Sequence, residues 1–139
     1  MMLIIEMRKT IWRGLLLLFV LPLAACGDRD ALSSTAGLEP HQQQLRRAFA
    51  ICTGCHDVRP ELGHRFGPNL HGVIGRKAGS APGYGYSDAM RASDIVWDEQ
   101  TLDSFLALPT RQVPGTRMVN SIADPARRQA VIEYLSTLQ

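Results

Sequence analysis

Aromatic residues are scarce in this sequence: four Phe, three Tyr and two Trp are spread over 139 residues. A domain of about a hundred residues normally buries about two-thirds of the surface that its unfolded chain exposes. So few aromatic side chains supply little of the apolar area that such burial requires. An embedded apolar cofactor would make up the shortfall.

Net charge is also small. The chain has 15 Lys plus Arg against 13 Asp plus Glu, a formal charge of +2. Arg8, Lys9, Arg13 and Glu6 lie in the first 25 residues, and without them 12 charges of each sign remain. This balance excludes the basic footprint of a nucleic-acid-binding protein. Any docking guided by charge must therefore depend on a local patch.

Long hydrophobic runs are absent as well. The longest apolar run, residues 14–25, is well short of the roughly 20 residues that a membrane-spanning helix needs. Because it follows three cationic residues, we expect residues 1–25 to be a signal peptide, with Met7 as an alternative start. The run ends Leu-Ala-Ala-Cys at Cys26, which resembles the bacterial lipobox and implies a lipid on Cys26. Cleavage by the ordinary signal peptidase is the alternative, since both enzymes accept such small residues.

Strand-like alternation and internal repeats are missing too, which argues against all-β and repeat folds. Residues 26–39 are polar and aperiodic and read as a flexible linker, so we expect one folded domain over residues 40–139. Helices are predicted from Pro40 to Cys52, from an N-cap at Asp98 to Leu108, and from an N-cap at Asp124 onward. Residues 57–85 are rich in Gly and Pro and predict a long loop that needs something to wrap around.

The apolar positions of these helices predict their buried faces. They are Leu45, Ala48, Phe49 and Cys52 in the first helix, Leu102, Phe105 and Leu106 in the second, and Ala130, Val131, Tyr134, Leu135 and Leu138 in the last. Helices at both ends with irregular chain between them indicate an all-α domain whose terminal helices pack together.

The strongest chemical signal is Cys52-Thr53-Gly54-Cys55-His56. Two thiols separated by two residues can each add to a vinyl group of haem, and the adjacent imidazole then reaches the iron from the same side. The segment predicts one haem c, attached through Cys52 and Cys55, with His56 as an iron ligand. With Cys26 lipidated, all three cysteines are used, as suits an oxidising compartment.

Three other uses of these cysteines compete with haem. A zinc site would need two further ligands, and His64 and His71 would give it an unusual spacing. A redox-active disulfide normally sits beside a strand and opens a helix, whereas this motif closes one. The short loop between the two thiols disfavours a structural disulfide.

A second iron ligand must come from farther along the chain. The candidates are Met90, Met118, His41, His64 and His71. Met118 follows a Pro-Gly turn able to press a thioether against iron, but methionine is usually core filler. The residues alone leave this choice open.

Several segments together resemble mitochondrial-type class I cytochrome c. They are residues 67–79 (GPNLHGVIGRKAG), residues 86–89 (YSDA), Trp97 and residues 114–118 (PGTRM), with nearly constant spacing from His56 to Met118. The resemblance covers about residues 45–139. It implies the cytochrome c fold, a small all-α domain with packed N- and C-terminal helices and long loops wrapped around one haem.

The resemblance also implies roles for single residues. Met118 would be the distal ligand opposite His56, and the Pro68 carbonyl would accept the His56 ring N–H and so fix its tautomer. Asn69 and Leu70 would line the haem pocket.

Four further residues correspond to family positions around the haem. Arg76, Tyr86 and Trp97 would bond the haem propionates, because carboxylates under a low-dielectric cover require donors. Thr116 would offer a hydroxyl near the distal side.

The chain departs from the family at several positions. Phe105 stands where the family has a distal Tyr, Met90 where it has a buried Asn, and Asn120 where an aromatic residue follows the ligand. The polar network near the ligand is therefore expected to be thin. Thr110 and Arg111 replace family lysines beside the ligand loop, so the basic docking ring is expected to be weak.

We therefore expect a monomeric one-electron carrier that is not an enzyme and has no small-molecule substrate. The expected setting is the periplasmic side of a bacterial membrane, where a lipid anchor holds the chain near membrane-bound redox complexes. There it would work between a quinol-oxidising complex and a terminal oxidase. The alternatives are a haem enzyme or sensor from which Met118 dissociates, and the haem subunit of a periplasmic dehydrogenase. One CxxCH motif cannot form a two-haem peroxidase.

Overall fold

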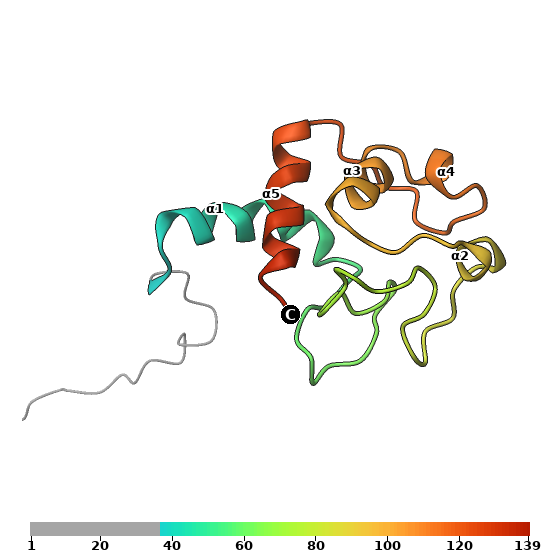
Figure 1. Ribbon diagram of the computed structural model, residues 1–139. Helices are drawn as coiled ribbons and strands as arrows, with labels where there is room; N and C mark the ends of the chain where they lie inside the picture. Colours follow the sequence, from blue (N-terminus) through green and yellow to red (C-terminus); the bar gives the residue numbers. More distant parts are fainter. Residues whose placement is uncertain (1–36) are drawn as a thin grey trace, which may run out of the picture. The chain divides into compact units, whose positions relative to one another are not determined.

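The computed structural model describes residues 37–139 (Figure 1). The expected signal peptide, the lipidation of Cys26 and the linker up to residue 36 lie outside the described residues. No helix in the described part is long and apolar enough to cross a membrane.

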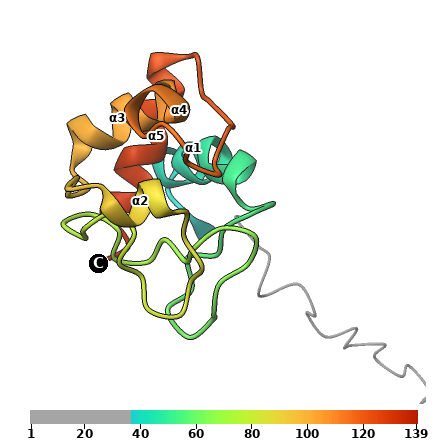
Figure 2. The same cartoon turned by 90° about the vertical axis from the view of Figure 1, so that its right-hand side faces the viewer.

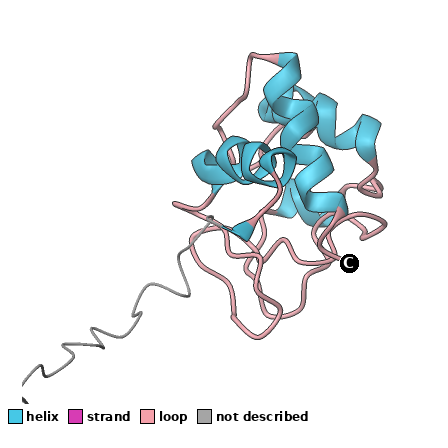
Figure 3. Ribbon diagram, turned by 90° about the vertical axis from the view of Figure 1, so that its left-hand side faces the viewer, coloured by secondary structure: helices cyan, strands magenta, loops and turns pink. Residues whose placement is uncertain are grey.

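Helices are the regular elements of the described chain. They are α1 (Pro40–Phe49), the 3-10 turn η3 (Ala50–Cys52), α2 (Asp88–Ala92), α3 (Glu99–Ala107), α4 (Pro109–Gln112) and α5 (Pro125–Ser136). Residues 37–139 contain no β-strand, and the extended pairing among them is a single antiparallel bridge between Lys77 and Val96 (Figure 3). The all-α prediction is confirmed.

The two terminal helices pack against each other, as the sequence predicts. Figures 1 and 2 show α1 lying across α5, and α3 packs on α5 as well. Phe49 of α1 contacts Tyr134 of α5, with ring centroids 4.8 Å apart. Because α5 has two helical neighbours, Ile132 is buried beside the predicted Val131 and Leu135. Its apolar residues therefore spread over more than one stripe.

The helix starts follow from capping. Asp98 accepts a hydrogen bond from the Thr101 N–H at 2.7 Å, and the Thr101 hydroxyl accepts one from the Asp98 N–H at 2.8 Å. This reciprocal pair satisfies two otherwise free donors at the start of α3. Asp124 caps α5 by accepting from the Ala126 N–H at 3.0 Å, with Pro125 at the first helical position. Both predicted N-caps are confirmed.

Two short helices were not predicted. Pro109 ends α3 as expected, but it also begins α4, because proline is tolerated in the first turn, where its missing N–H costs nothing. The five residues of α2 are too few to show a periodicity. Ser87 caps α2 by accepting from the Met90 N–H at 3.2 Å, which sets Met90 on the buried side.

The long loop between η3 and α2 is held by its own side chains. Both ring nitrogens of His64 are engaged: Nδ1 accepts from the Asn69 N–H at 3.0 Å, and Nε2 bonds the Pro82 carbonyl at 2.7 Å. This joins two parts of the loop 18 residues apart. At Gly79, with φ +72°, a Cβ would lie 2.5 Å from the Met90 carbonyl oxygen, so the loop approaches α2 more closely than a side chain would allow.

Candidate functional site

The helices and the loops of the described chain surround a cavity of about 290 Å³. Its walls come from η3, α3, α5, the loop after Cys55 and the segment around Met118. Every residue expected to contact the cofactor lines it except Asn69; they are Cys52, Cys55, His56, Pro68, Leu70, Arg76, Tyr86, Trp97, Phe105, Thr116 and Met118. The folded chain thus gathers positions that lie up to 66 residues apart.

The two thiols reach the cavity from one turn of chain. The backbone N–H groups of Cys55 and His56 both donate to the Cys52 carbonyl, at 3.1 and 2.9 Å, and this turn brings all three residues to the same wall. Cys52 and Cys55 are free thiols, not a disulfide. Burial raises the pKa of Cys52 to about 11, against an opposing effect of the Arg127 charge. The Cys52 thiol is therefore neutral at physiological pH and compatible with an apolar cavity.

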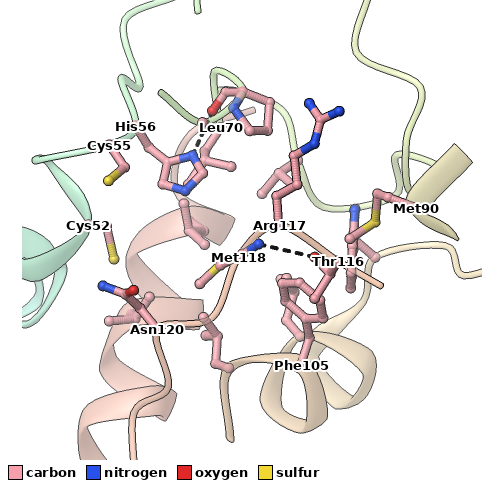
Figure 4. Close-up of a pocket in the computed structure, with 18 of the residues that line it drawn as sticks. Cys52, Cys55, His56, Leu70, Met90, Phe105, Thr116, Arg117, Met118 and Asn120 are labelled. Atoms are coloured by element: carbon pink, nitrogen blue, oxygen red, sulfur yellow. Dashed lines mark hydrogen bonds between the residues drawn. The ribbon is translucent and has the colours of Figure 1, made fainter. Parts of the chain in front are cut away.

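The His56 ring is held from behind. Its Nδ1–H donates to the Pro68 carbonyl at 2.7 Å, which leaves Nε2 bare and facing the cavity (Figure 4). Burial lowers the pKa of His56, and the hydrogen bond to Pro68 acts in the opposite direction. Burial therefore favours the neutral imidazole, whose free nitrogen is a metal ligand.

Gly67 lets the chain pass directly beside this ring. A Cβ at Gly67 would lie 2.3 Å from His56 Cε1 and 2.6 Å from Nδ1, distances that no side chain can occupy. The Gly67 N–H also donates to the Cys55 carbonyl at 2.8 Å. Glycine at this position therefore sets the close approach that brings the Pro68 carbonyl to the histidine.

A thioether faces His56 from the opposite wall. Figure 4 shows the Met118 side chain directed at the space in front of the imidazole, whereas Met90, in α2, lies away from His56. The Met118 N–H donates to the Thr116 hydroxyl at 3.3 Å, and the Thr116 N–H donates to the Val113 carbonyl at 3.0 Å. These two bonds fix the turn that presents Met118.

The three candidate histidines do not line the cavity. His41 pairs with Glu133 at 2.6 Å on the surface, and His64 uses both ring nitrogens in the loop. His71 is not among the cavity-lining residues. Within residues 37–139 no group of three or more His, Cys, Asp or Glu side chains could hold a metal ion. The described chain thus lacks the four-ligand set that the zinc alternative needs.

Polar donors line the cavity on the side of the loops. Arg76 donates to the carbonyls of Asn69 at 2.9 Å and His71 at 3.2 Å. Burial is the main cause that raises the pKa of Tyr86. Trp97 is buried against Phe105, with ring centroids 5.0 Å apart, and its indole N–H donates to no protein group in the described part of the chain. These groups can serve carboxylates that enter the cavity.

Asn69 is placed differently from the expectation. Its amide N–H groups donate to the carbonyls of Arg59 at 2.8 Å and Leu62 at 2.9 Å, and its side-chain oxygen accepts from the His71 N–H at 2.8 Å. Asn69 does not line the cavity. It braces the loop behind the cavity wall instead, because three backbone groups there complete its hydrogen bonding.

Much of the apolar wall was not identified as such from the sequence. It includes Phe49, Val73, Leu102, Leu106 and Val131. Most of these were predicted to be buried, but periodicity does not distinguish a side chain that faces another helix from one that faces a cavity. Helical spacing marks Leu102 and Leu106, whereas Val73 lies in a loop that carries no pattern.

The residues present fit a covalently bound haem. The walls are mainly apolar, two free thiols lie on one side, and an imidazole and a thioether face each other across the space. The close approach of the chain at Gly67 lets the Pro68 carbonyl position the imidazole. A backbone carbonyl is a common partner of metal-binding histidines in proteins.

Comparison with known proteins points the same way. No protein-family model matches the chain. The chain is 46% identical over 92 residues to cytochrome c2 of Rhodomicrobium vannielii, which covers 66% of this chain and 74% of the relative. It is 45% identical over 93 residues to cytochrome c2 iso-2 of Magnetospirillum molischianum, covering 66% of this chain and 94% of that protein.

A solved structure supports the same assignment. Cytochrome cH from Methylobacterium extorquens is 42% identical, with a TM-score of 0.64, and the match covers 69% of this chain and 97% of that one. The fold, the cavity chemistry and these relatives agree. The chain therefore belongs to the class I c-type cytochromes, with one haem c attached covalently through Cys52 and Cys55.

Proposed function

We propose that this mono-haem electron carrier holds its iron between His56 and Met118 and shuttles electrons at a bacterial membrane. The observation that carries the proposal is the facing pair: a neutral imidazole with a bare Nε2 and a thioether directed at the same space. With His56 and Met118 both bound, the iron would have no open position for a substrate. The bound haem supplies a one-electron couple between ferrous and ferric iron.

The protein's own residues would hold the two ligands in the same place in both redox states. The Pro68 carbonyl fixes the imidazole tautomer, and the two-bond turn at Thr116 holds Met118 in place. The apolar walls exclude water from the cavity and keep its dielectric low, which tunes the potential of a metal centre. A site that moves little on a change of charge supports fast electron exchange.

The setting that we propose is the periplasmic side of a bacterial membrane. The apolar run that ends at Cys26 supports export and lipid anchoring, and the electron-carrier family supports a position between a quinol-oxidising complex and a terminal oxidase. The charge balance of the chain after the leader supports redox proteins, not nucleic acids, as partners.

Replacement of Met118 tests the ligand pair directly. In Met118→Ala, the sulfur-to-iron charge-transfer band of the ferric protein should disappear while the haem stays attached, because Cys52 and Cys55 are untouched. Met90→Leu is the matched control and should retain the band, because Met90 lies away from His56. A band that survives in Met118→Ala and is lost in Met90→Leu would refute the assignment. If the wild-type ferric protein lacks the band, Met118 is not bound to the iron. That result would support the alternative function, an enzyme or a sensor with an open iron.

A further inference from the structure

A buried carboxylate directly follows the proposed iron ligand His56. It belongs to Asp57, which is 8% exposed and is the one buried charged side chain among residues 37–139. The carboxylates that pair with Arg or Lys elsewhere in this part of the chain are 31% to 97% exposed; they are Asp88, Asp94 and Asp103. Because a buried charge costs free energy unless it is paired and hydrogen-bonded, Asp57 needs partners.

Four hydrogen bonds hold the Asp57 carboxylate. Its Oδ1 accepts from the backbone N–H of Val58 at 2.9 Å and from that of Arg59 at 3.0 Å. The Arg59 guanidinium closes on the same carboxylate, with Nε donating to Oδ1 at 3.0 Å and Nη2 donating to Oδ2 at 2.8 Å. Donors of this number favour the ionised form, and a two-point contact with arginine is among the stronger ion pairs. Asp57 therefore keeps its negative charge.

This charge has a fixed position next to the imidazole. The Leu70 N–H donates to the Asp57 carbonyl at 2.9 Å, which ties Asp57 to the loop whose Pro68 carbonyl accepts from His56 Nδ1. Asp57 is not among the residues that line the cavity. Its carboxylate therefore lies behind the cavity wall, where it can act on a bound haem through its charge and not through contact.

Arg59 neutralises this charge only in part. The Arg59 side chain is 63% exposed, whereas that of Asp57 is 8% exposed. Water and salt ions screen an exposed charge strongly and a buried one much less. On the buried side of the ion pair, the negative charge therefore outweighs the positive one.

We propose that Asp57 is a fixed negative charge that lowers the reduction potential of the haem, and that Arg59 limits how far it does so. When a partner takes one electron from ferrous iron, the haem gains one positive charge. A buried carboxylate nearby stabilises that charge and so favours the ferric form. The inference rests on the proposed electron-carrier function, and it adds a residue pair that decides which partners can give electrons to this protein.

The experiment measures the ratio of reduced to oxidised holoprotein at one fixed potential and pH 7. Asp57→Asn keeps an oxygen that can accept from the backbone N–H groups but removes the charge, and it should raise the ratio about fivefold. Arg59→Gln should lower the ratio by a smaller factor, and Arg59→Lys should leave it near the wild-type value. Asp94→Asn is the matched control, because it makes the same change at a carboxylate that is ion-paired with Lys77 but 96% exposed. It should leave the ratio unchanged.

Salt separates the two charges of the pair. The difference between wild type and Asp57→Asn should persist from low to high ionic strength, because the Asp57 carboxylate is buried. The effect of Arg59→Gln should shrink as salt is added, because the guanidinium is exposed.

Three results would overturn the role of Asp57. The first is an unchanged ratio in Asp57→Asn, and the second is an equal change in Asp57→Asn and Asp94→Asn. The third is a rise of the ratio in both Asp57→Asn and Arg59→Gln, which would show that the ion pair acts by bracing the turn and not by its charge. A wild-type ferric protein without the sulfur-to-iron band would instead refute the proposed ligand pair, and the comparison of Asp57→Asn with Asp94→Asn would still decide the role of Asp57.

Discussion

At the scale of single residues, the surroundings of Met118 are unusually poor in polar groups. Phe105 and Met90 both line the cavity. Cytochromes c of the family that this chain resembles have a Tyr in place of Phe105 and an Asn in place of Met90. The Thr116 hydroxyl is already used by the Met118 N–H. Among the described residues no side-chain hydrogen bond to the Met118 sulfur is present, so the thioether keeps its full electron density for the iron.

Phe105→Tyr should therefore raise the reduction potential. A phenol hydroxyl donating to the Met118 sulfur withdraws electron density and favours ferrous iron. A hydrogen bond contributes about 1 kcal/mol. Since about 59 mV corresponds to 1.4 kcal/mol for one electron, the expected rise is about 40 mV. Potentiometry measures it, and Phe105→Leu, which adds no hydroxyl, is the control. A fall, or an equal rise in both variants, would contradict this explanation.

The sequence predicted most of the site at this scale because its chemistry is local. Cys52, Cys55 and His56 lie within five residues, so the spacing of the motif alone identified them. Asn69 was misplaced because the direction of its side chain depends on the carbonyls of Arg59 and Leu62, and only the folded loop brings these carbonyls within reach.

At the scale of elements, the reciprocal cap of α3 carries a titratable group. Two hydrogen bonds from Thr101 lower the pKa of Asp98. The bond from the Thr101 N–H has the larger effect, and the bond from its hydroxyl has the smaller one. A carboxyl whose folded pKa is depressed contributes stability that is present above its unfolded pKa of about 3.9 and is lost as pH falls through the folded pKa. The start of α3, and with it Leu102, Phe105 and the cavity wall, should weaken in acid.

Asp98→Asn tests this contribution. Asparagine can still cap a helix, but it carries no charge. The wild type should be more stable than the variant at pH 7, and its advantage should hold down to about pH 5 and shrink below about pH 4. Denaturant unfolding of both proteins at a series of pH values gives the difference in free energy. A difference that stays constant down to pH 3 would show that the charge of Asp98 contributes nothing.

The elements also show why sequence patterns have limits. Residues 99–107 and 125–136 are long enough for caps and apolar spacing to be recognised together, and both helices were predicted with their N-caps. The short α2 and α4 depend on tertiary packing, since isolated helices of that length are unstable. Met90 became a cavity residue through a helix that no periodicity could reveal.

At the scale of the whole molecule, the expected lipid on Cys26 would act together with the segment that follows it. If residues 27–39 are the linker that the sequence predicts, a coil of that length has an r.m.s. span of about 20 Å and a stretched limit of about 45 Å. The haem would then stay in a thin layer above the membrane. Confinement of that kind raises the effective concentration toward embedded partners to about millimolar. It would compensate for the small net charge of the domain.

Cys26→Ser tests the anchor. The wild type should remain with membranes through a high-salt wash, because two or more acyl chains give stable attachment. The variant should appear in the soluble fraction or as uncleaved precursor, with an unchanged haem spectrum. Fractionation followed by mass spectrometry of the N-terminus distinguishes these forms. Wild-type protein found in the soluble periplasm with an unmodified Cys26 would leave a freely diffusing carrier.

The packing of α1 on α5 also sets an order of events during synthesis. The partner of α1 is the last helix of the described chain, and the Gly72 N–H bonds the Leu138 carbonyl at 2.6 Å. Contacts so distant in sequence cannot form until residue 138 has been made. While the chain is shorter than that, the cavity has no back wall and Cys52 and Cys55 lie in open polypeptide. Closure of the cavity by α5 therefore comes last, and until then both thiols remain open to haem.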